Sequence, residues 1–393
     1  MATASRITGK AAAKVVDGRD WILPNDAFVD ILLRLPPITL WRCRLVSWHW
    51  RAVIDERTPW RSQPKPLAFC VNGAGTSATA YVFDNLADER HRMISRRGCK
   101  LAMVGTCNGL LCVFCDGGHI RLINPVTGEK LRVPPCPEYK PWRSSSKSFS
   151  FGFHLPTGLY KIVYLPYAGR FYELQVFTLG DASSWRRVAV PGESSCHPDA
   201  GLVSVAGYTF WVTQGADRVA SFDLGDESVA HVPLPVEVGR DCYYNRCHLT
   251  EVHGRLGLAV STFQNPAMAT TEVWVLGEGR ERHKWSRKYR VQMEGVEQQL
   301  ARPHFAHGEY ILTTDTRKGT QQVFGHRLLH KGRQLVNGEV QSVRIRDAGT
   351  PVAGIPTNSC LRGTFAFVET TEPLRVYKLH RRKSHTTKAC ARV

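Results

Sequence analysis

The sequence lacks the long apolar runs that membrane-spanning and secreted proteins carry. No stretch of its 393 residues approaches the roughly 20 apolar residues of a membrane helix, and residues 1–18 hold no apolar core of signal-peptide length. Twelve cysteines are scattered without the framework of a small disulfide-rich domain. We therefore expect no membrane partner and reduced thiols, in the cytoplasm, the nucleus or both.

Motifs that mark common catalytic sites are also missing. There is no G-x-x-x-x-G-K-[ST] phosphate loop, no H-E-x-x-H metal helix and no G-x-S-x-G nucleophile turn. Cys107, Cys112 and Cys115 form a cluster in the sequence that could suggest a zinc site. Cys112 and Cys115 are an odd number of residues apart, so on a strand their side chains face opposite ways and cannot easily share an ion. We therefore expect buried thiols. A second group would bind zinc only if a loop folded back, namely Cys242, Cys247, His248 and His253. We predict no metal, no cofactor and no catalytic residue, although a set assembled across the fold remains open.

Acidic residues are few relative to basic ones, 34 against 52, which gives a net charge of +18. Such a charge permits contact with acidic partners or nucleic acid. Because the basic residues are spread along the whole chain, a solvated basic surface is favoured and nucleic acid is not an expected partner. Ten tryptophans and 33 glycines favour strands and turns over a helical bundle.

Residues 20–57 carry the one dense helical pattern. Asn25 and Asp26 are good N-caps, and Pro36 ends the first helix. The first apolar face has the spacing i, i+3, i+4, i+7 in Phe28, Ile31, Leu32 and Leu35. A second stripe, with Ser47 as a candidate cap, consists of Leu40, Cys43, Val46, Trp50 and Val53. About 40 residues cannot bury all of these groups, so the surplus must lie against the rest of the chain, as a helical cap, or against another protein.

This segment resembles the F-box, a three-helix module that docks onto a Skp-family adaptor. The matching residues are Leu23-Pro24, Ile31-Leu32-x-Arg34-Leu35-Pro36, Leu40 with Arg42 and Arg44, Val46-Ser47, Trp50-Arg51 and Ile54. The resemblance implies an adaptor-facing surface made of Leu23, Pro24, Ile31, Leu32, Leu35 and Pro36. The predicted adaptor-binding set also includes Leu40, Val46 and Trp50. Of these, Val46 and Trp50 are expected mainly to hold the helices together, with part of Trp50 available to the partner. Trp41 and Trp48 depart from the family pattern but keep its apolar character.

From residue 67 onward, short apolar runs alternate with turn residues, which predicts many short strands in a sandwich, barrel or propeller. A weak repeat favours the propeller. Residues 176–181 lead to Trp185 and residues 273–278 lead to Trp285, while residues 123–125 lead to Pro134 and residues 222–224 lead to Pro233. Both pairs are offset by about 100 residues, or two blades of roughly 50 residues each. The predicted fold is thus a small all-α segment followed by a large all-β domain, a six- or seven-bladed β-propeller.

Two structural expectations follow from the propeller reading. Trp185 and Trp285 are expected to fill the gap between adjacent sheets rather than stack on a ligand. A candidate strand at residues 375–379 is expected to pair with an early strand and close the ring, since closure removes exposed sheet edges.

The large domain is similar to the F-box-associated domain of plant F-box proteins. The matching pieces include Gly105-x-Cys107-Asn108-Gly109-Leu110-Leu111-Cys112, then residues 124–129, then Phe151-Gly152-Phe153. The resemblance covers residues from about 67 to 290 and implies a kelch-like propeller that recruits a target protein. The expected organisation is a disordered segment at 1–19, the F-box at 20–57, a linker at 58–66, the propeller at 67–380 and a basic tail at 381–393.

We therefore interpret the chain as a non-catalytic substrate receptor of a Skp–cullin–F-box ubiquitin ligase. Its expected partners are the Skp-family adaptor, through it a cullin, and a target protein. A loop with exposed aromatic and arginine residues, Tyr139, Trp142 and Arg143, is a candidate target contact. The alternatives are a propeller enzyme with its site at the channel mouth and a scaffold that binds the adaptor outside ubiquitin transfer.

Overall fold

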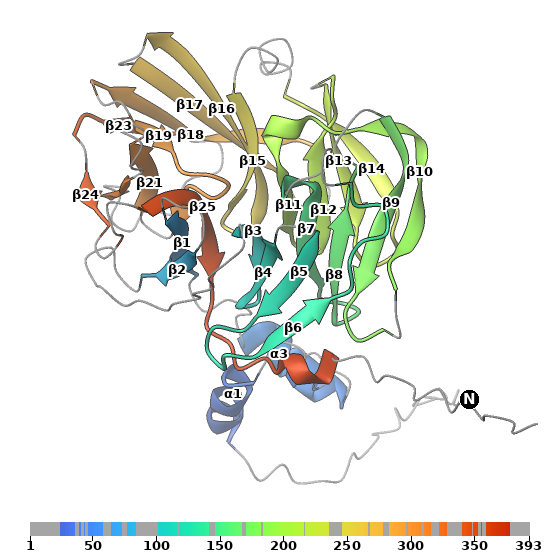
Figure 1. The fold of residues 1–393 in the computed structure, drawn as a ribbon. Coiled ribbons are helices and arrows are strands. Elements are labelled where there is room, and N and C mark those ends of the chain that lie inside the picture. The colour runs from blue at the N-terminus through green and yellow to red at the C-terminus, as the bar shows by residue number, and fades with distance from the viewer. Residues whose placement is uncertain are drawn as a thin grey trace, which may run out of the picture.

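The computed structural model describes residues 24–377 with internal gaps. The residues outside this description are 1–23, 36–38, 41–42, 44–45, 58–63, 73–76, 84–100, 116–117, 141–145, 167–169, 182–183, 216, 236–245, 266–267, 278–282, 296–297, 308–309, 316–321, 328–339, 348, 353–354, 356–358 and 378–393. The described residues form a short helical segment and six β-sheets (Figure 1). No helix in these ranges is long and apolar enough to cross a bilayer.

The helical segment contains helix α1 (Asn25–Leu33) and helix α3 (Trp48–Arg57). Pro24, rather than Asn25 or Asp26, occupies the N-cap of α1, and its carbonyl accepts the Phe28 N–H at 3.0 Å. Ser47 caps α3 as predicted, because its hydroxyl accepts the Trp50 N–H at 3.2 Å. Between the two helices, Thr39, Leu40 and Cys43 are also helical.

The first three sheets follow the chain order except for one late strand. The first sheet consists of β1 (Lys65–Asn72), β2 (Ala78–Val82) and β25 (Ser359–Phe367). The second consists of β3 (Leu101–Cys107), β4 (Leu110–Cys115), β5 (His119–Ile123) and β6 (Lys130–Val133). The third consists of β7 (Phe149–His154), β8 (Leu159–Tyr164), β9 (Arg170–Thr178) and β10 (Arg186–Ser195).

Of the remaining sheets, the fourth has four strands, and the fifth and sixth have five strands each. The fourth consists of β11 (Leu202–Val205), β12 (Tyr208–Val212), β13 (Arg218–Asp223) and β14 (Val229–Pro233). The fifth consists of β15 (Arg246–Val252), β16 (Arg255–Asn265), β17 (Met268–Leu276), β18 (Trp285–Glu294) and β23 (Gln341–Ile345), which runs parallel to β18. The sixth consists of β19 (Gln298–Leu300), β20 (Ala306–His307), β21 (Tyr310–Asp315), β22 (Gln322–Arg327) and β24 (Thr350–Pro351). Short 3₁₀ turns are η1 (Ser146–Ser148), η2 (Pro198–Ala200) and η5 (Leu374–Tyr377).

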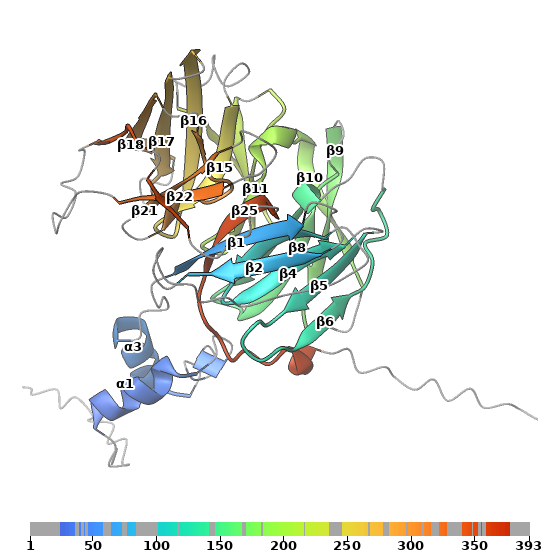
Figure 2. The same cartoon turned by 60° about the vertical axis from the view of Figure 1, so that its left-hand side comes forward.

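The core of the large domain lies between successive sheets. Buried apolar clusters join the first sheet to the second, the second to the third and so on, and a further cluster joins the sixth sheet back to the first. Strand β4 shows how the sequence achieves this, since successive residues of a strand face opposite ways. Leu110, Cys112 and Phe114 pack with the third sheet, while Leu111, Val113 and Cys115 pack with the first. Within the described chain the sheets thus close a ring, and the prediction of a propeller is confirmed with six blades (Figures 1 and 2).

The predicted repeat corresponds to a repeated contact between blades. The indole N–H of Trp185 donates to the carbonyl of Pro134 at 2.8 Å, and that of Trp285 donates to the carbonyl of Pro233 at 2.9 Å. Each bond ties a sheet to the one before it. The two repeating features, a tryptophan and a proline, are therefore the donor and the acceptor of one hydrogen bond between blades. The predicted role of both tryptophans, to fill the gap between adjacent sheets, is confirmed.

The ring closes at the first sheet, but through a different strand from the one predicted. β25 pairs antiparallel with β1 from Lys65↔Phe367 to Asn72↔Ser359. The prediction of a strand at 375–379 is wrong for its described residues, which lie in η5. The reason is the spacing of the apolar side chains: Leu374 and Tyr377 are both buried in the cluster between the second and third sheets, while Val376 is exposed. A spacing of three suits one helical turn and not a strand.

The segment that follows β25 is held against the second sheet by Asn124, a fully buried residue in the β5–β6 turn. Its side-chain amide donates to the carbonyls of Thr370 at 3.1 Å and Glu372 at 2.8 Å. Its side-chain oxygen accepts the N–H groups of Val126 and Thr127. One turn residue therefore organises both its own loop and the end of the described chain.

A buried ion pair links the third and fourth blades. The ammonium of Lys161 on β8 lies 2.6 Å from the carboxylate of Glu227, in the β13–β14 turn. Arg186 of β10 also donates to this carboxylate. Burial raises the pKa of Glu227, but the hydrogen bonds from Arg186 and Lys161 outweigh it and leave the pKa below its usual value. The carboxylate is thus charged at neutral pH and holds two blades together.

Candidate functional site

The helical segment has a small core of its own. Phe28, Leu32, Leu40, Val53 and Ile54 are buried together, with Leu35, Cys43 and Trp50 packed beside them. The rings of Phe28 and Trp50 meet edge to face with centroids 4.7 Å apart. At the surface, an ion pair of 2.8 Å joins Asp26 on α1 to Arg57 on α3. These contacts fix the crossing of the two helices, and with it the side chains that remain outside.

Three large apolar side chains of this segment lie in solvent. Ile31 and Leu33 on α1 are each 50% exposed, and Val46 before α3 is 63% exposed. Across the described residues only six large apolar side chains are exposed, so the short helical segment holds half of them. Single exposed apolar residues are ordinary, but their concentration on one small segment is a pattern typical of protein-binding segments. We call Ile31, Leu33 and Val46 the exposed apolar triad.

The structure divides the residues predicted to bind the adaptor into three groups. Pro24 and Ile31 are exposed, as a docking surface requires. Leu32 and Leu40 are instead buried in the core of the segment, and Leu35 and Trp50 are half-buried beside them. Leu23 and Pro36 lie outside the described residues. Binding to an adaptor remains a prediction for the whole set.

Two details of the helical prediction need correction. Val46 was expected to hold the helices together, but it is exposed, whereas Trp50 does pack between them. Leu33 was missed because it lies outside the apolar stripe of α1. This position could have predicted its exposure, since a leucine off the core face of a short helix has no apolar partner within the segment.

The loop predicted to contact a target is described only in part. Trp142 and Arg143 lie outside the described residues. Tyr139 is half-buried, and its ring lies 5.7 Å from that of Phe114 and 6.2 Å from that of Phe149. This places the Tyr139 ring against the wall of the propeller, where it also lines a central pocket. Its proposed contact with a target remains a prediction.

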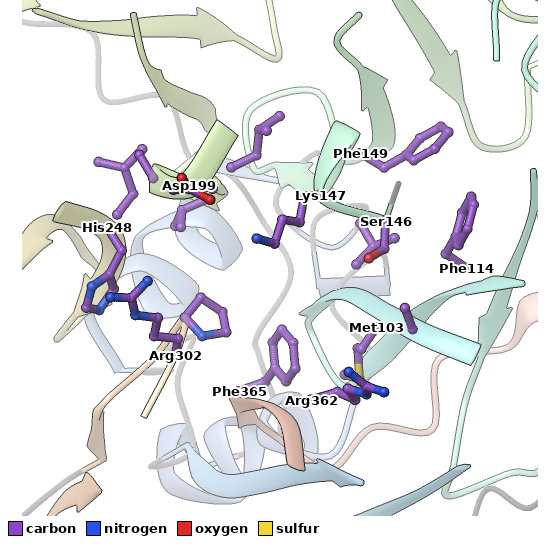
Figure 3. A pocket seen from close by; sticks show the side chains of 18 of the residues that line it. Met103, Phe114, Ser146, Lys147, Phe149, Asp199, His248, Arg302, Arg362 and Phe365 are labelled. Carbon is purple, nitrogen blue, oxygen red and sulfur yellow. The ribbon is translucent and has the colours of Figure 1, made fainter. Parts of the chain in front are cut away.

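The central pocket has a volume of about 600 Å³ and is lined by residues of the first five sheets and by Arg302 and Pro303, which lie between β19 and β20 of the sixth. It therefore lies on the axis of the ring, where the innermost strands converge. Figure 3 shows its side chains, which include Met103, Phe149 and Phe365 among the apolar ones and Lys147, Arg302 and Arg362 among the charged ones. Its size is that of an ordinary small-molecule site.

The thiols of Cys112 and Cys115 are separated by the fold, as their odd spacing on a strand predicts. Cys112 and Cys115 are both buried on β4, but they belong to the clusters on opposite faces of the second sheet. Burial raises the pKa of Cys107 to about 12 and that of Cys112 further still. Among the described residues, no group of three or more His, Cys, Asp or Glu side chains could hold a metal ion.

Comparison with known proteins agrees with this architecture. Residues 22–62 match the model of the F-box domain, and residues 63–324 match that of the F-box associated beta propeller domain. The chain belongs to the F-box proteins that carry an F-box-associated β-propeller domain.

Relatives of this F-box protein occur in Arabidopsis thaliana, which supports its identification as a plant F-box protein. It is 25% identical over 327 residues to "F-box protein At3g07870", a match that covers 72% of this chain and 76% of that protein. It is 26% identical over 282 residues to "Putative F-box protein At1g33530", covering 67% of this chain and 61% of that protein. Among solved structures, it is similar to the Cps50 (Swd1) β-propeller domain of Myceliophteria thermophila, with 11% identity, a TM-score of 0.37, and coverage of 78% of this chain and 97% of that one.

Proposed function

We propose that this F-box protein is a substrate receptor of a Skp–cullin–F-box ubiquitin ligase. The helical segment binds a Skp-family adaptor and through it a cullin, and the propeller binds a target protein. The observation that supports this proposal is the exposed apolar triad, because a segment with a closed core has no structural use for three more apolar side chains in water. A helical cap would turn these side chains toward the propeller.

The proposed role requires no catalytic group in this chain. A receptor raises the effective concentration of a target lysine beside the ubiquitin-carrying enzyme, and the gain comes from proximity. The half-buried thiol of Cys107 and the buried thiol of Cys112 agree with such a role, since their raised pKa values keep them protonated at neutral pH.

The test is co-purification of the full chain with a Skp-family adaptor. In the variant Ile31→Ser/Leu33→Ser/Val46→Ser we expect adaptor binding to be lost and the circular dichroism of the propeller to be unchanged. Tyr172→Ser is the matched control, because Tyr172 is also a largely exposed apolar residue but lies on β9 of the third sheet. It should bind the adaptor as the parent chain does.

Leu32→Ala separates surface from core within the same helix. Since Leu32 is fully buried, its truncation should cost about 2–5 kcal/mol of stability in the helical segment. A parent chain that fails to bind the adaptor would refute the receptor proposal. A triple-serine variant that still binds would show that the exposed apolar triad is not the docking surface.

A further inference from the structure

The lining of the central pocket carries more basic than acidic side chains. Its charged lining residues are Lys147, Arg302 and Arg362 against one carboxylate, Asp199, in the described part of the wall. In Figure 3, Arg302 lies beside His248 on one side of the pocket, Arg362 lies near Met103 on the other, and Phe365 stands between them. Positive groups that converge on a concave site raise the local concentration of anions.

His248 gives a second, independent indication of a ligand. This residue of β15 lines the pocket and is only 3% exposed, yet neither of its ring nitrogens has a hydrogen-bond partner among the described residues. Burial, with the positive charge of nearby Arg302 and the influence of His304, lowers its pKa to about 3. The ring is thus neutral at pH 7, with one nitrogen able to donate and the other able to accept. A buried imidazole without partners is costly unless something in the pocket completes its bonds.

Backbone bonds connect the chain segments that carry the two arginines, β25 of the first sheet and the segment between β19 and β20 of the sixth. The carbonyl of Arg302 accepts the N–H of Thr364 at 2.8 Å, and the carbonyl of Thr364 accepts the N–H of His304 at 3.3 Å. Thr364 is two residues from Arg362 on β25. Both arginines are therefore carried by backbone that is paired across the ring closure. Such support fixes the backbone positions of both arginines before a ligand arrives.

Apolar side chains complete the lining. Phe365, Phe149 and Met103 are buried residues whose side chains reach the pocket from the first, third and second sheets. The combination of an apolar wall, a few convergent polar groups and a volume of about 600 Å³ is typical of sites for small organic ligands. An extended acidic peptide strand would need a long groove, whereas this pocket is a compact hollow of about 600 Å³ between the sheets.

We propose that the axial pocket of the propeller binds a small organic anion that has an apolar ring. Its oxyanion group, a phosphate or a carboxylate, is held by Arg362, Lys147 and Arg302. Its apolar ring lies against Phe365, and a polar atom of the ligand forms a hydrogen bond with His248. Binding of the anion does not depend on the proposed receptor function. Its biological role does, because in a receptor the anion would control which target protein the propeller accepts.

The test uses isothermal titration calorimetry on the full chain, with 1-naphthyl phosphate as the probe. Two partial probes separate the contributions: 1-naphthol has the ring without the charge, and inorganic phosphate has the charge without the ring. We expect one site for 1-naphthyl phosphate and much weaker binding of both partial probes. In Arg362→Gln the affinity should fall at least about tenfold, since a charge-assisted hydrogen bond is lost.

Arg290→Gln is the matched control, because Arg290 is exposed on β18 and does not line the pocket. Its affinity for 1-naphthyl phosphate should change by less than about twofold. Lys147→Met is the second pocket variant and serves if Arg362→Gln does not fold. His248→Gln should also weaken binding without changing the dependence on salt, because it removes no charge.

Three results would overturn the proposal. They are no binding of 1-naphthyl phosphate, equal binding by the parent and Arg362→Gln, and binding of a hexaglutamate peptide in place of the small probe. The last would assign the pocket to an acidic segment of a target. Calorimetry needs neither adaptor nor target, so a failure here leaves the receptor proposal intact. A chain that fails to bind the adaptor can still pass this test.

Discussion

Acidification from pH 7 to pH 5 should strongly destabilise the propeller, because burial strongly lowers the pKa of three of its histidines. His248, His304 and His307 have pKa values lowered from 6.5 to about 3, 3 and 4. Burial is the main cause for each. For His248 the positive charge of Arg302 and the influence of His304 lower the pKa further, and for His304 the influence of His307 does so. For His307 a hydrogen bond with the backbone of His304 acts in the opposite direction. All three rings are therefore neutral in the folded chain throughout this pH range.

The geometry at His304 supports its neutral form directly. Its Nδ1 accepts the backbone N–H of Glu251 at 3.1 Å, so this nitrogen carries no proton in the folded chain. Protonation there would set two donors against each other. The same bond joins β15 of the fifth sheet to the chain between β19 and β20 of the sixth. The histidine thus links its protonation state to the contact between two blades.

The magnitude follows from proton linkage. Because the folded pKa values are lowered, the unfolded chain binds more protons than the folded one below pH 6.5, and stability falls as the pH falls through that range. Between pH 7 and pH 5 each histidine costs about 2 kcal/mol, and the three together about 6 kcal/mol. Carboxylates contribute little in this window, since their ordinary pKa values lie near 4. A loss of this size is a large part of the stability of an ordinary domain.

The assay is chemical denaturation of the full chain at pH 7 and pH 5, followed by tryptophan fluorescence. The variant His304→Asn keeps an acceptor for the Glu251 N–H but cannot titrate, so its loss between the two pH values should shrink to about 4 kcal/mol. His283→Asn is the control, because His283 is exposed. Equal stability of the parent chain at the two pH values would refute the reasoning, as would an unchanged loss in His304→Asn.

Three further predictions concern contacts between blades, each measured as a change in the free energy of unfolding at pH 7. Glu227→Ala should cost about 3–5 kcal/mol because it leaves the buried ammonium of Lys161 without its carboxylate, whereas Glu138→Ala, at an exposed ion pair, should cost under about 1 kcal/mol. Trp185→Phe should cost about 1–3 kcal/mol, since a carbonyl of the second sheet loses its donor. Asn124→Ala should cost about 2–4 kcal/mol and expose the segment after β25 to protease; equal protease resistance would contradict its role.

The propeller was predictable because the same chemically distinctive residues, Trp and Pro, recur at a constant spacing in the sequence. Trp185 and Trp285 stand about 100 residues apart, and their partners Pro134 and Pro233 share that offset. Each is a landmark because one indole N–H must find one carbonyl between two sheets. The alternation of apolar residues on β4 was equally readable, since both faces of a blade are buried against neighbours.

The closing strand and the helical surface were less predictable, for a shared reason. At residues 374–377 the apolar pattern fits either a short strand or a helical turn, and the cluster that buries Leu374 and Tyr377 decides between them. On α1, neighbouring Ile31 and Leu32 both belong to one apolar face by periodicity. Which of the two is buried depends on where Trp50 of α3 packs. The spacing of apolar residues predicts which face of a helix or strand is apolar, but not where the neighbouring element packs on that face.

The pairing of β1 with β25 has a consequence for synthesis of the protein. The two strands are separated by about 300 residues, which a ribosome adds in about 15–60 s at about 5–20 residues per second. During that interval one edge of β1, an apolar strand, has no partner, and such an edge invites aggregation. The helical segment precedes β1, so a nascent chain displays its exposed apolar triad well before the ring can close. Any product that stops before β25 would then keep the surface proposed for the adaptor while lacking a closed domain for the target.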